Sequence, residues 1–223
     1  GGALGNYAYG LKAKEWLLDP DNIDITGDNT AVAAGYSKIK ASDIQTNLNN
    51  GTSVTVSTTA PRTNQPSYVG STVTGDGNIL VNETITKSVG GDATLTLIAD
   101  NKIDVNKAIT GNSADGLLNL DFTANGTTTS TTDVTNSGGI HLNAVVNVNG
   151  DVKLTGTNSN TEVNKLQNGV HIAQNLTAKS IDITGVSNGI TASGIGVRVM
   201  ADVEATGGDV KMNGTGNSQW GIY

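Results

Sequence analysis

A repeat of roughly 28 residues constrains this chain more than any other feature of its sequence. The segment GIHLNAVVNVNGDVKLTG, which begins at Gly139, is echoed as GVHIAQNLTAKSIDITG from Gly169 and as GVRVMADVEATGGDVKMNG from Gly196. Each copy contains short alternating apolar runs separated by Gly, Asn and Asp, and no run is long enough to fold alone. Each run therefore needs a partner strand.

Three strand-sized runs in each copy predict one coil of a parallel β-helix, in which every strand pairs with its equivalent one coil away. Because side chains alternate across a strand, every second residue of a run is expected to face the interior. The residues expected to face inward in the three copies are Ile140, Leu142, Val152 and Leu154; Val170, Ile172, Ile181 and Ile183; and Val197, Val199, Val210 and Met212.

The same alternation continues less regularly before the repeats, for example at Ile23 and Ile25 and at the pair Ile44 and Leu48. We therefore expect one all-β domain over residues 1–223, a parallel β-helix (solenoid) of about six coils with three strands per coil.

Within this domain, residues 1–137 form the less regular coils and residues 138–223 form the regular repeats. Three polar tracts interrupt the pattern and are expected to be loops extruded from corners: residues 57–77, 123–138 and 157–168.

Composition agrees with this fold and excludes several functions. Only 36% of the residues are hydrophobic, Phe occurs once and Gly 29 times, which favours short strands and turns. The chain has no cysteine, so disulfides and thiolate metal sites are excluded. A net charge of −7 argues against a nucleic-acid partner. No apolar stretch is long enough to span a membrane, so no membrane insertion is expected.

One segment near the start resembles a known family. EWLLDPDNIDIT, at 15–26, is similar to the W-L-[LIV]-[DN]-P-x-N-[IV]-x-[IV] signature of the large exoproteins of Gram-negative two-partner secretion. Filamentous haemagglutinin and the high-molecular-weight adhesins typify this family. Segments that follow, such as GDGNILVNETI and ATLTLIADNKIDVNKAI, keep the family's order. The Asn-rich partner-recognition motif of the family's secretion domain is not found, so we expect an internal segment of a longer exoprotein.

The resemblance implies that the parallel β-helix is right-handed. It also implies a location and partners. It implies export through an outer-membrane β-barrel transporter, a secreted or cell-surface location, and attachment to a glycan or protein receptor on host cells. Two alternatives stay open: a passive stalk of a contact-dependent toxin or haemolysin, and a polysaccharide lyase or hydrolase, since many parallel β-helices cleave glycans.

The signature segment also has a physical interpretation. Trp16, Leu17 and Leu18 are expected to form a compact apolar plug, because a Trp beside two Leu usually packs in a core. Asp19 and Pro20 begin a turn that leads into the strand at Ile23.

Two histidines and an arginine are the candidate binding residues. His141, His171 and Arg198 take the same outward position in successive copies, so we expect a column with about 4.8 Å between neighbours and no acidic member. Nearby positive charge disfavours protonation, so the pKa values of the imidazoles are expected to lie below the ordinary value. Two histidines without a third ligand do not make a metal site, and no metal or cofactor is expected.

No catalytic residues are assigned, and the chain is expected not to be an enzyme. Glycan-cleaving β-helices cluster several carboxylates on one outer face. Here the outward positions of the third run are Lys153, Asp182 and Lys211, an alternation that indicates a charge ladder between stacked strands. Five N-x-[ST] sequons also occur, at about the number expected by chance: Asn50, Asn82, Asn125, Asn175 and Asn213.

Overall fold

The structure is a computed structural model of the 223-residue chain. It describes residues 22–58, 76–126, 138–159, 167–188, 194–217 and 220–223, together with the backbone of 15–18. Nearly all of the regular structure in these ranges is β-strand, and every pairing between strands is parallel. The prediction of an all-β parallel architecture is confirmed.

The strands form three parallel sheets, called sheet A, sheet B and sheet C below. Within the described residues, sheet A has seven strands: β1 (Glu15–Leu18), β4 (Ser53–Ser57), β7 (Ala93–Ala99), β10 (Leu118–Ala124), β13 (Asp151–Asn158), β16 (Ser180–Ser187) and β19 (Val210–Gly216). The described part of sheet B also has seven: β3 (Ser37–Lys40), β2 (Ile23–Thr26), β5 (Ile79–Val81), β8 (Lys102–Val105), β11 (Gly139–Leu142), β14 (Val170–Ile172) and β17 (Val197–Val199). Sheet C has five in the same ranges: β6 (Ile85–Lys87), β9 (Ile109–Gly111), β12 (Val146–Val148), β15 (Leu176–Ala178) and β18 (Val203–Ala205).

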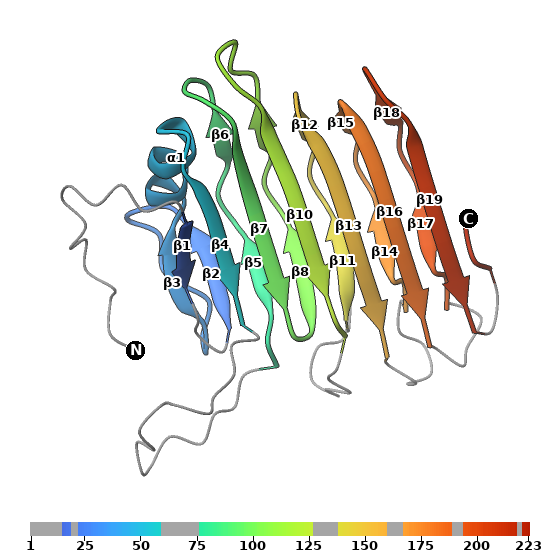
Figure 1. The fold of residues 1–223 in the computed structure, drawn as a ribbon. Coiled ribbons are helices and arrows are strands. Elements are labelled where there is room, and N and C mark those ends of the chain that lie inside the picture. The colour runs from blue at the N-terminus through green and yellow to red at the C-terminus, as the bar shows by residue number, and fades with distance from the viewer. Residues whose placement is uncertain are drawn as a thin grey trace.

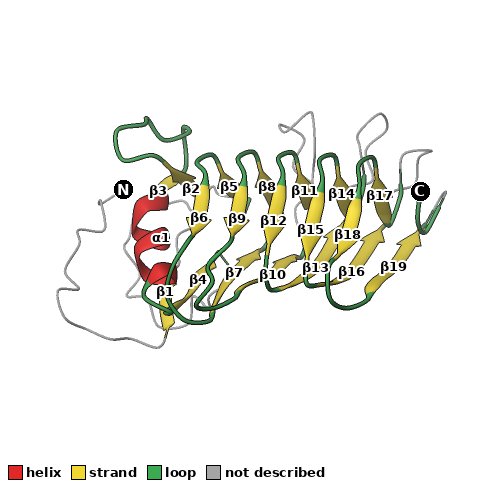
Figure 2. Ribbon diagram, turned by 90° about the horizontal axis from the view of Figure 1, so that it is seen from above, coloured by secondary structure: helices red, strands yellow, loops and turns green. Residues whose placement is uncertain are grey.

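From β4 onward the chain visits sheets A, B and C in turn, so each strand lies beside its equivalent from the previous passage (Figure 1). Seen from above, the three sheets enclose a common interior along the whole array (Figure 2). This arrangement is consistent with a parallel solenoid, and it gives each short run the partner strand that it needs.

The interior consists of apolar columns held in register by the strand pairing. In sheet A, Leu95, Leu120, Val152 and Ile181 are successive partners, and each is at most 2% exposed. The single phenylalanine, Phe122, lies in the adjacent inward column and is fully buried. Burial of each such side chain contributes about 1.5–3 kcal/mol to the hydrophobic stabilisation. These columns are the main stabilising feature of the fold.

The inward positions predicted for the first two repeats are all buried. In the third repeat Val197 is buried, Val199 and Met212 are partly buried, and Val210 is 43% exposed. The difference has a simple cause. Within the described residues no further strand of sheet A covers β19, so its side chains have neighbours on one side only.

Ile44 and Leu48, which the alternation suggested were strand residues, lie in a helix, and that prediction is wrong. Helix α1 (Ala41–Asn49) places Ala41, Ile44 and Leu48 on one face, and all three are buried. The spacing of three and four residues is the helical period. The helix lies at the end of the array beside β6, in line with sheet C (Figure 2).

Two side chains of α1 bind the open edge of sheet C. Gln45 Oε1 accepts a hydrogen bond from the backbone N–H of Thr86 at 2.9 Å, and Asn49 Oδ1 accepts from Ser88 and Val89 at 2.9 and 3.2 Å. An unpaired sheet edge is a template for association with another chain. The helix therefore covers both the apolar end of the interior and the exposed edge of sheet C.

Close packing at the corner between sheets A and B requires glycine. A Cβ on Gly156 would lie 2.1 Å from the carbonyl oxygen of Gly169, and one on Gly185 would lie 2.1 Å from that of Gly196. Gly156 and Gly185 are partners in adjacent strands, so the same contact recurs in each repeat. This contact explains the glycine that all three copies carry at this position, Gly156, Gly185 and Gly214.

The three tracts expected to be loops begin later than predicted. Strand β4 continues to Ser57, β10 to Ala124 and β13 to Asn158, so the first residues of each tract belong to sheet A. The interiors of the three tracts, 59–75, 127–137 and 160–166, lie outside the described residues.

Candidate functional site

The column of basic residues lies on the outer side of sheet B, in the predicted register. His141 of β11 is the partner of His171 of β14, and His171 is the partner of Arg198 of β17. The two imidazole rings stand edge to face, with centroids 6.4 Å apart and an interplanar angle of 74°. The alignment of the three side chains follows directly from the period of the repeat.

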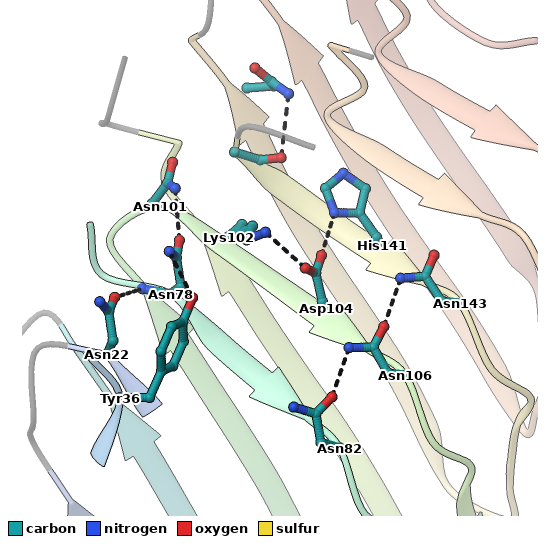
Figure 3. Close-up of polar contacts among 12 residues, drawn as sticks. Asn22, Tyr36, Asn78, Asn82, Asn101, Lys102, Asp104, Asn106, His141 and Asn143 are labelled. Carbon is teal, nitrogen blue, oxygen red and sulfur yellow. Dashed lines mark hydrogen bonds and ion pairs between the residues drawn. The ribbon is translucent and has the colours of Figure 1, made fainter. Parts of the chain in front are cut away.

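The column has an acidic member, so the prediction that it lacks one is wrong. Asp104 of β8 is the partner of His141, and its Oδ1 lies 2.7 Å from His141 Nδ1 (Figure 3). Its other oxygen, Oδ2, lies 3.0 Å from Lys102 Nζ. The site is therefore a row of ionisable side chains on the outer side of sheet B. In order, its members are Lys102, Asp104, His141, His171 and Arg198.

The sequence contained a signal for Asp104. The run Ile103-Asp104-Val105 has the same pattern as Ile140-His141-Leu142, and the two runs pair residue for residue. Alignment of these runs would have placed the carboxylate beside the imidazole. The tract at 123–138 lies between them and breaks the spacing, so the repeat alone did not reveal the match.

Burial separates the two histidines. His141 has no exposed surface, although its side chain points away from the apolar interior, whereas His171 and Arg198 are partly exposed. His141 Nε2 is also buried and has no hydrogen-bond partner within the described residues. His141 is therefore enclosed by protein and His171 is partly accessible, and the binding role of His141, His171 and Arg198 stays a prediction.

The Asp104 carboxyl is held in its ionised form. Burial opposes ionisation, but the hydrogen bond from His141 and the positive charges of His141 and Lys102 outweigh it. The pKa of Asp104 therefore lies below its ordinary value. Through its contacts with His141 Nδ1 and Lys102 Nζ, the buried Asp104 carboxylate joins strands β8 and β11 across the outer side of sheet B.

His171 is held in its neutral form. Burial is the largest cause, and together with the charges of His141 and Arg198 it lowers the pKa of the imidazole to about 4. The predicted fall is confirmed for His171, but burial is the largest cause and the neighbouring positive charges come second.

The arrangement limits the chemistry that this column can perform. An Asp–His pair orients an imidazole for acid–base catalysis, yet a general base needs a reacting proton within hydrogen-bond reach of its free nitrogen. His141 Nε2 is enclosed in the protein. Among the described residues no group of three or more His, Asp or Glu side chains is arranged to hold a metal ion. The geometry fits a structural charge network with one partly exposed end at His171 and Arg198.

A second polar feature, a ladder of asparagines, was missed by sequence reasoning. Asn143 donates to Asn106 at 3.0 Å, and Asn106 donates to Asn82 at 2.9 Å (Figure 3). Asn82 in turn donates to Asp24 at 2.9 Å. Each Asn directly follows the last residue of a sheet B strand, in the runs ILVN, IDVN and IHLN. These repeated endings were the available signal. The ladder satisfies side-chain amides at the corner between sheets B and C.

A further set of amides lies at the corner that leads into sheet B. Asn101 donates to Asn78 at 2.7 Å, and Asn78 donates to the Tyr36 hydroxyl at 3.2 Å (Figure 3). Asn22 Oδ1 accepts from the backbone N–H groups of Gly77 and Asn78 at 3.1 and 2.8 Å. The hydrogen bonds of these asparagines hold the turn in place, which is a structural role.

The signature segment is described only in part. Its first residues form strand β1, and the register places Trp16 opposite Val54 and Leu18 opposite Val56. The side chains of Trp16, Leu17 and Leu18 are not among the described atoms, and Asp19 and Pro20 lie outside the described residues. The interpretation of Trp16, Leu17 and Leu18 as an apolar plug stays a prediction.

The outward charge ladder of sheet A has the predicted register and one additional member. Asp121, Lys153, Asp182 and Lys211 are successive partners on β10, β13, β16 and β19. Within the described part of the chain, however, none of the four forms an ion pair with another residue. The alternation is present, but the side chains are not bound to one another.

No family model, curated protein or solved structure matches this chain in comparisons with known proteins. The likeness to two-partner secretion exoproteins thus stays a prediction from the segment at 15–26. No helix in the described part of the chain has the length and apolar character needed to cross a bilayer.

Proposed function

We propose that this chain is a non-catalytic rod segment of a Gram-negative two-partner secretion adhesin, secreted and displayed at the bacterial surface. In this proposal the three parallel sheets form a right-handed β-helix of about six coils. The observation that carries the proposal is the continuity of the buried columns through all three sheets. An uninterrupted interior produces a stiff, extended body whose outer positions are free to vary.

Two further observations support this assignment. The segment that resembles the family's signature begins with a strand of sheet A, β1, which pairs with β4 and so belongs to the parallel array. In addition, the most catalysis-like pair, Asp104 and His141, is buried, and its free nitrogen is enclosed. Such a pair suits a role in stability better than glycan cleavage.

A passive stalk is the second candidate. The described outward positions of sheet A are mainly Ser, Thr, Asx and Lys, for example Thr94, Thr96, Thr155 and Thr184, and none is aromatic. Aromatic anchors usually dominate binding surfaces. Their absence from this face favours a spacer, with attachment located in another part of the parent exoprotein.

Binding of the purified 223-residue chain to epithelial cells and to a glycan array tests the proposal. We expect saturable binding that is retained by Asp182→Asn, which alters an exposed residue, and lost in Ile181→Asp, which places a charge in the buried column. Absence of binding would favour the stalk. Release of reducing ends from a polysaccharide substrate would overturn the non-catalytic assignment.

The secretion route needs a separate test. The parent exoprotein should reach the medium or cell surface only when an outer-membrane transporter of the two-partner type is present. Equal secretion without that transporter would contradict this part of the proposal.

A further inference from the structure

The outer face of sheet A carries a charge pattern that is its own complement. Its central column reads Asp121, Lys153, Asp182 and Lys211, one residue from each of four adjacent strands. Lys153, Asp182 and Lys211 are exposed, and Asp121 is partly exposed. When the column is placed against a second copy that runs in the opposite direction, every Asp of one copy lies opposite a Lys of the other.

We propose that this face is the interface of a dimer between two copies of the chain. The two copies are related by a two-fold axis that runs parallel to the strands and lies between β13 and β16. In such an isologous interface, Lys153 of each copy faces Asp182 of the other, and Asp121 faces Lys211. The dimer therefore contains four opposite-charge pairs and no like-charge pair in this column. It is an interaction beyond the proposed function and does not depend on it.

The charges are available for such an interface because they are not used within the chain. None of the four side chains forms an ion pair with a described residue. By contrast, the charged row of sheet B is bound internally through Asp104, Lys102 and His141. The outer faces of sheets A and B thus differ, because in the described part of the chain sheet A presents an ordered line of charges that form no ion pairs.

The positions beside the charged column permit close approach of a second sheet. Thr155 and Thr184 are neighbouring partners in the next column, and the two-fold axis places each opposite the other's equivalent. In the column after that, Thr157 would face Val186. All of these side chains are short, so two such faces can reach the spacing of about 10 Å that is usual for packed sheets.

The size of the face predicts a weak dimer. Four strands of about seven residues cover about 23 Å by about 19 Å, so the two copies together bury on the order of 900 Å². Interfaces of this size are typical of transient complexes. Because its main attraction is between exposed charges, the dimer should weaken as the ionic strength rises.

Sedimentation velocity over a wide range of protein concentration tests this interface by charge exchange. We expect Lys153→Asp and Asp182→Lys each to weaken dimerisation by about tenfold or more, because symmetry replaces two attractive pairs by two repulsive pairs. The double variant that carries both exchanges restores opposite charges across the axis and should recover dimerisation. Recovery by the second exchange distinguishes facing pairs from a general effect of net charge.

Lys107→Asp is the matched control, since it makes the same change at an exposed residue outside sheet A. It should leave the dimer unchanged. Wild-type dimerisation should also fall between about 0.01 M and about 1 M salt, where the screening length falls from about 30 to about 3 Å. A monomeric wild type at low salt would overturn the proposal, and so would a double variant as weak as the single ones.

Cross-linking gives a second measurement that does not rely on charge. The chain has no cysteine, so Thr123→Cys and Asn213→Cys each introduce a unique thiol. The two-fold axis places Thr123 of one copy opposite Asn213 of the other, at about 10 Å, whereas identical residues lie about 17 Å apart. A bismaleimide with about 10 Å reach should couple the mixed variants efficiently and each variant alone poorly. Equal coupling in all three samples would refute the symmetry.

Discussion

Acidification should destabilise this protein through His171, and the size of the effect follows from the structure. Burial, with the charges of His141 and Arg198, lowers the pKa of His171 to about 4 in the folded state. In the unfolded chain the imidazole has its ordinary pKa of about 6.5. Between these two values the unfolded state binds more protons than the folded state, so stability is lost as the pH falls from about 6.5 to about 4.

A pKa difference of this size corresponds to at most about 3 kcal/mol of unfolding free energy. The ring of His171 is partly exposed, so solvent screening reduces the effect, and we expect about 1–2 kcal/mol. Asp104 acts in a different range. Its pKa is below the ordinary value of a carboxyl, so its contribution is present above about pH 4 and is lost at lower pH.

Urea unfolding at several pH values between 7 and 4, followed by far-ultraviolet circular dichroism, measures this loss of stability. His171→Gln retains a polar side chain without a titrating group, so its unfolding free energy should fall by about 1–2 kcal/mol less than that of the wild type. NMR titration of the imidazole should give a pKa of about 4. Identical pH profiles for wild type and variant, or a measured pKa at or above about 6.5, would refute the reasoning.

Substitutions at three other positions test the interior, the charge row and the corner. Phe122→Ala should lower the unfolding free energy by about 3–5 kcal/mol, because it leaves a cavity in a fully buried column; denaturant unfolding measures the loss. Asp104→Ala should cost about 3–5 kcal/mol because it removes the buried carboxylate that His141 and Lys102 contact, and Asp104→Asn, which retains an acceptor, should cost less in the same assay. Gly185→Ala should lower the thermal midpoint markedly, because its Cβ would collide with a backbone carbonyl; an unchanged midpoint would show that the corner relaxes.

The regular half of the fold could be predicted because its strands repeat at a nearly constant interval. Ile140, Val170 and Val197 mark the first strand of each copy, and they are partners in successive strands. A constant interval fixes both the inward face and the register, since a shift by one residue would expose the whole column. The prediction therefore extended to individual neighbours such as His141 and His171.

Helix α1 was not predicted because the two-residue alternation of strands was assumed to continue through residues 41–49, where the spacing is helical. Ala41, Ile44 and Leu48 are spaced by three and four residues, which is a helical pattern, but a single short helix among many strands has little weight in a search for repeats. The burial of His141 was also beyond the sequence. An outward position in the repeat shows only that a side chain points away from the apolar interior, and it does not show how exposed that side chain is.

The first half of the chain departs from the regular repeat, and this departure is connected with the closure of the array at the end where α1 and β6 lie. Gln45 and Asn49 of α1 bind backbone N–H groups at β6, and Lys87 of β6 is fully buried with its Nζ donating to the carbonyl oxygens of Val89 and Gly90, both at 2.8 Å. In an interior repeat these backbone groups would lie beside those of a neighbouring coil. Burial lowers the pKa of Lys87, with the charges of Asp92 and Asp115 acting in the opposite direction.

The contacts of Lys87 need a basic side chain at a position where the regular coils carry an apolar or small residue. In the neighbouring strand, the partner of Lys87 is Gly111. A sequence that closes the end of a parallel array must therefore depart from the repeat that builds it. This physical requirement accounts for why the apolar alternation weakens around α1 and β6 while the register of the sheets continues through them.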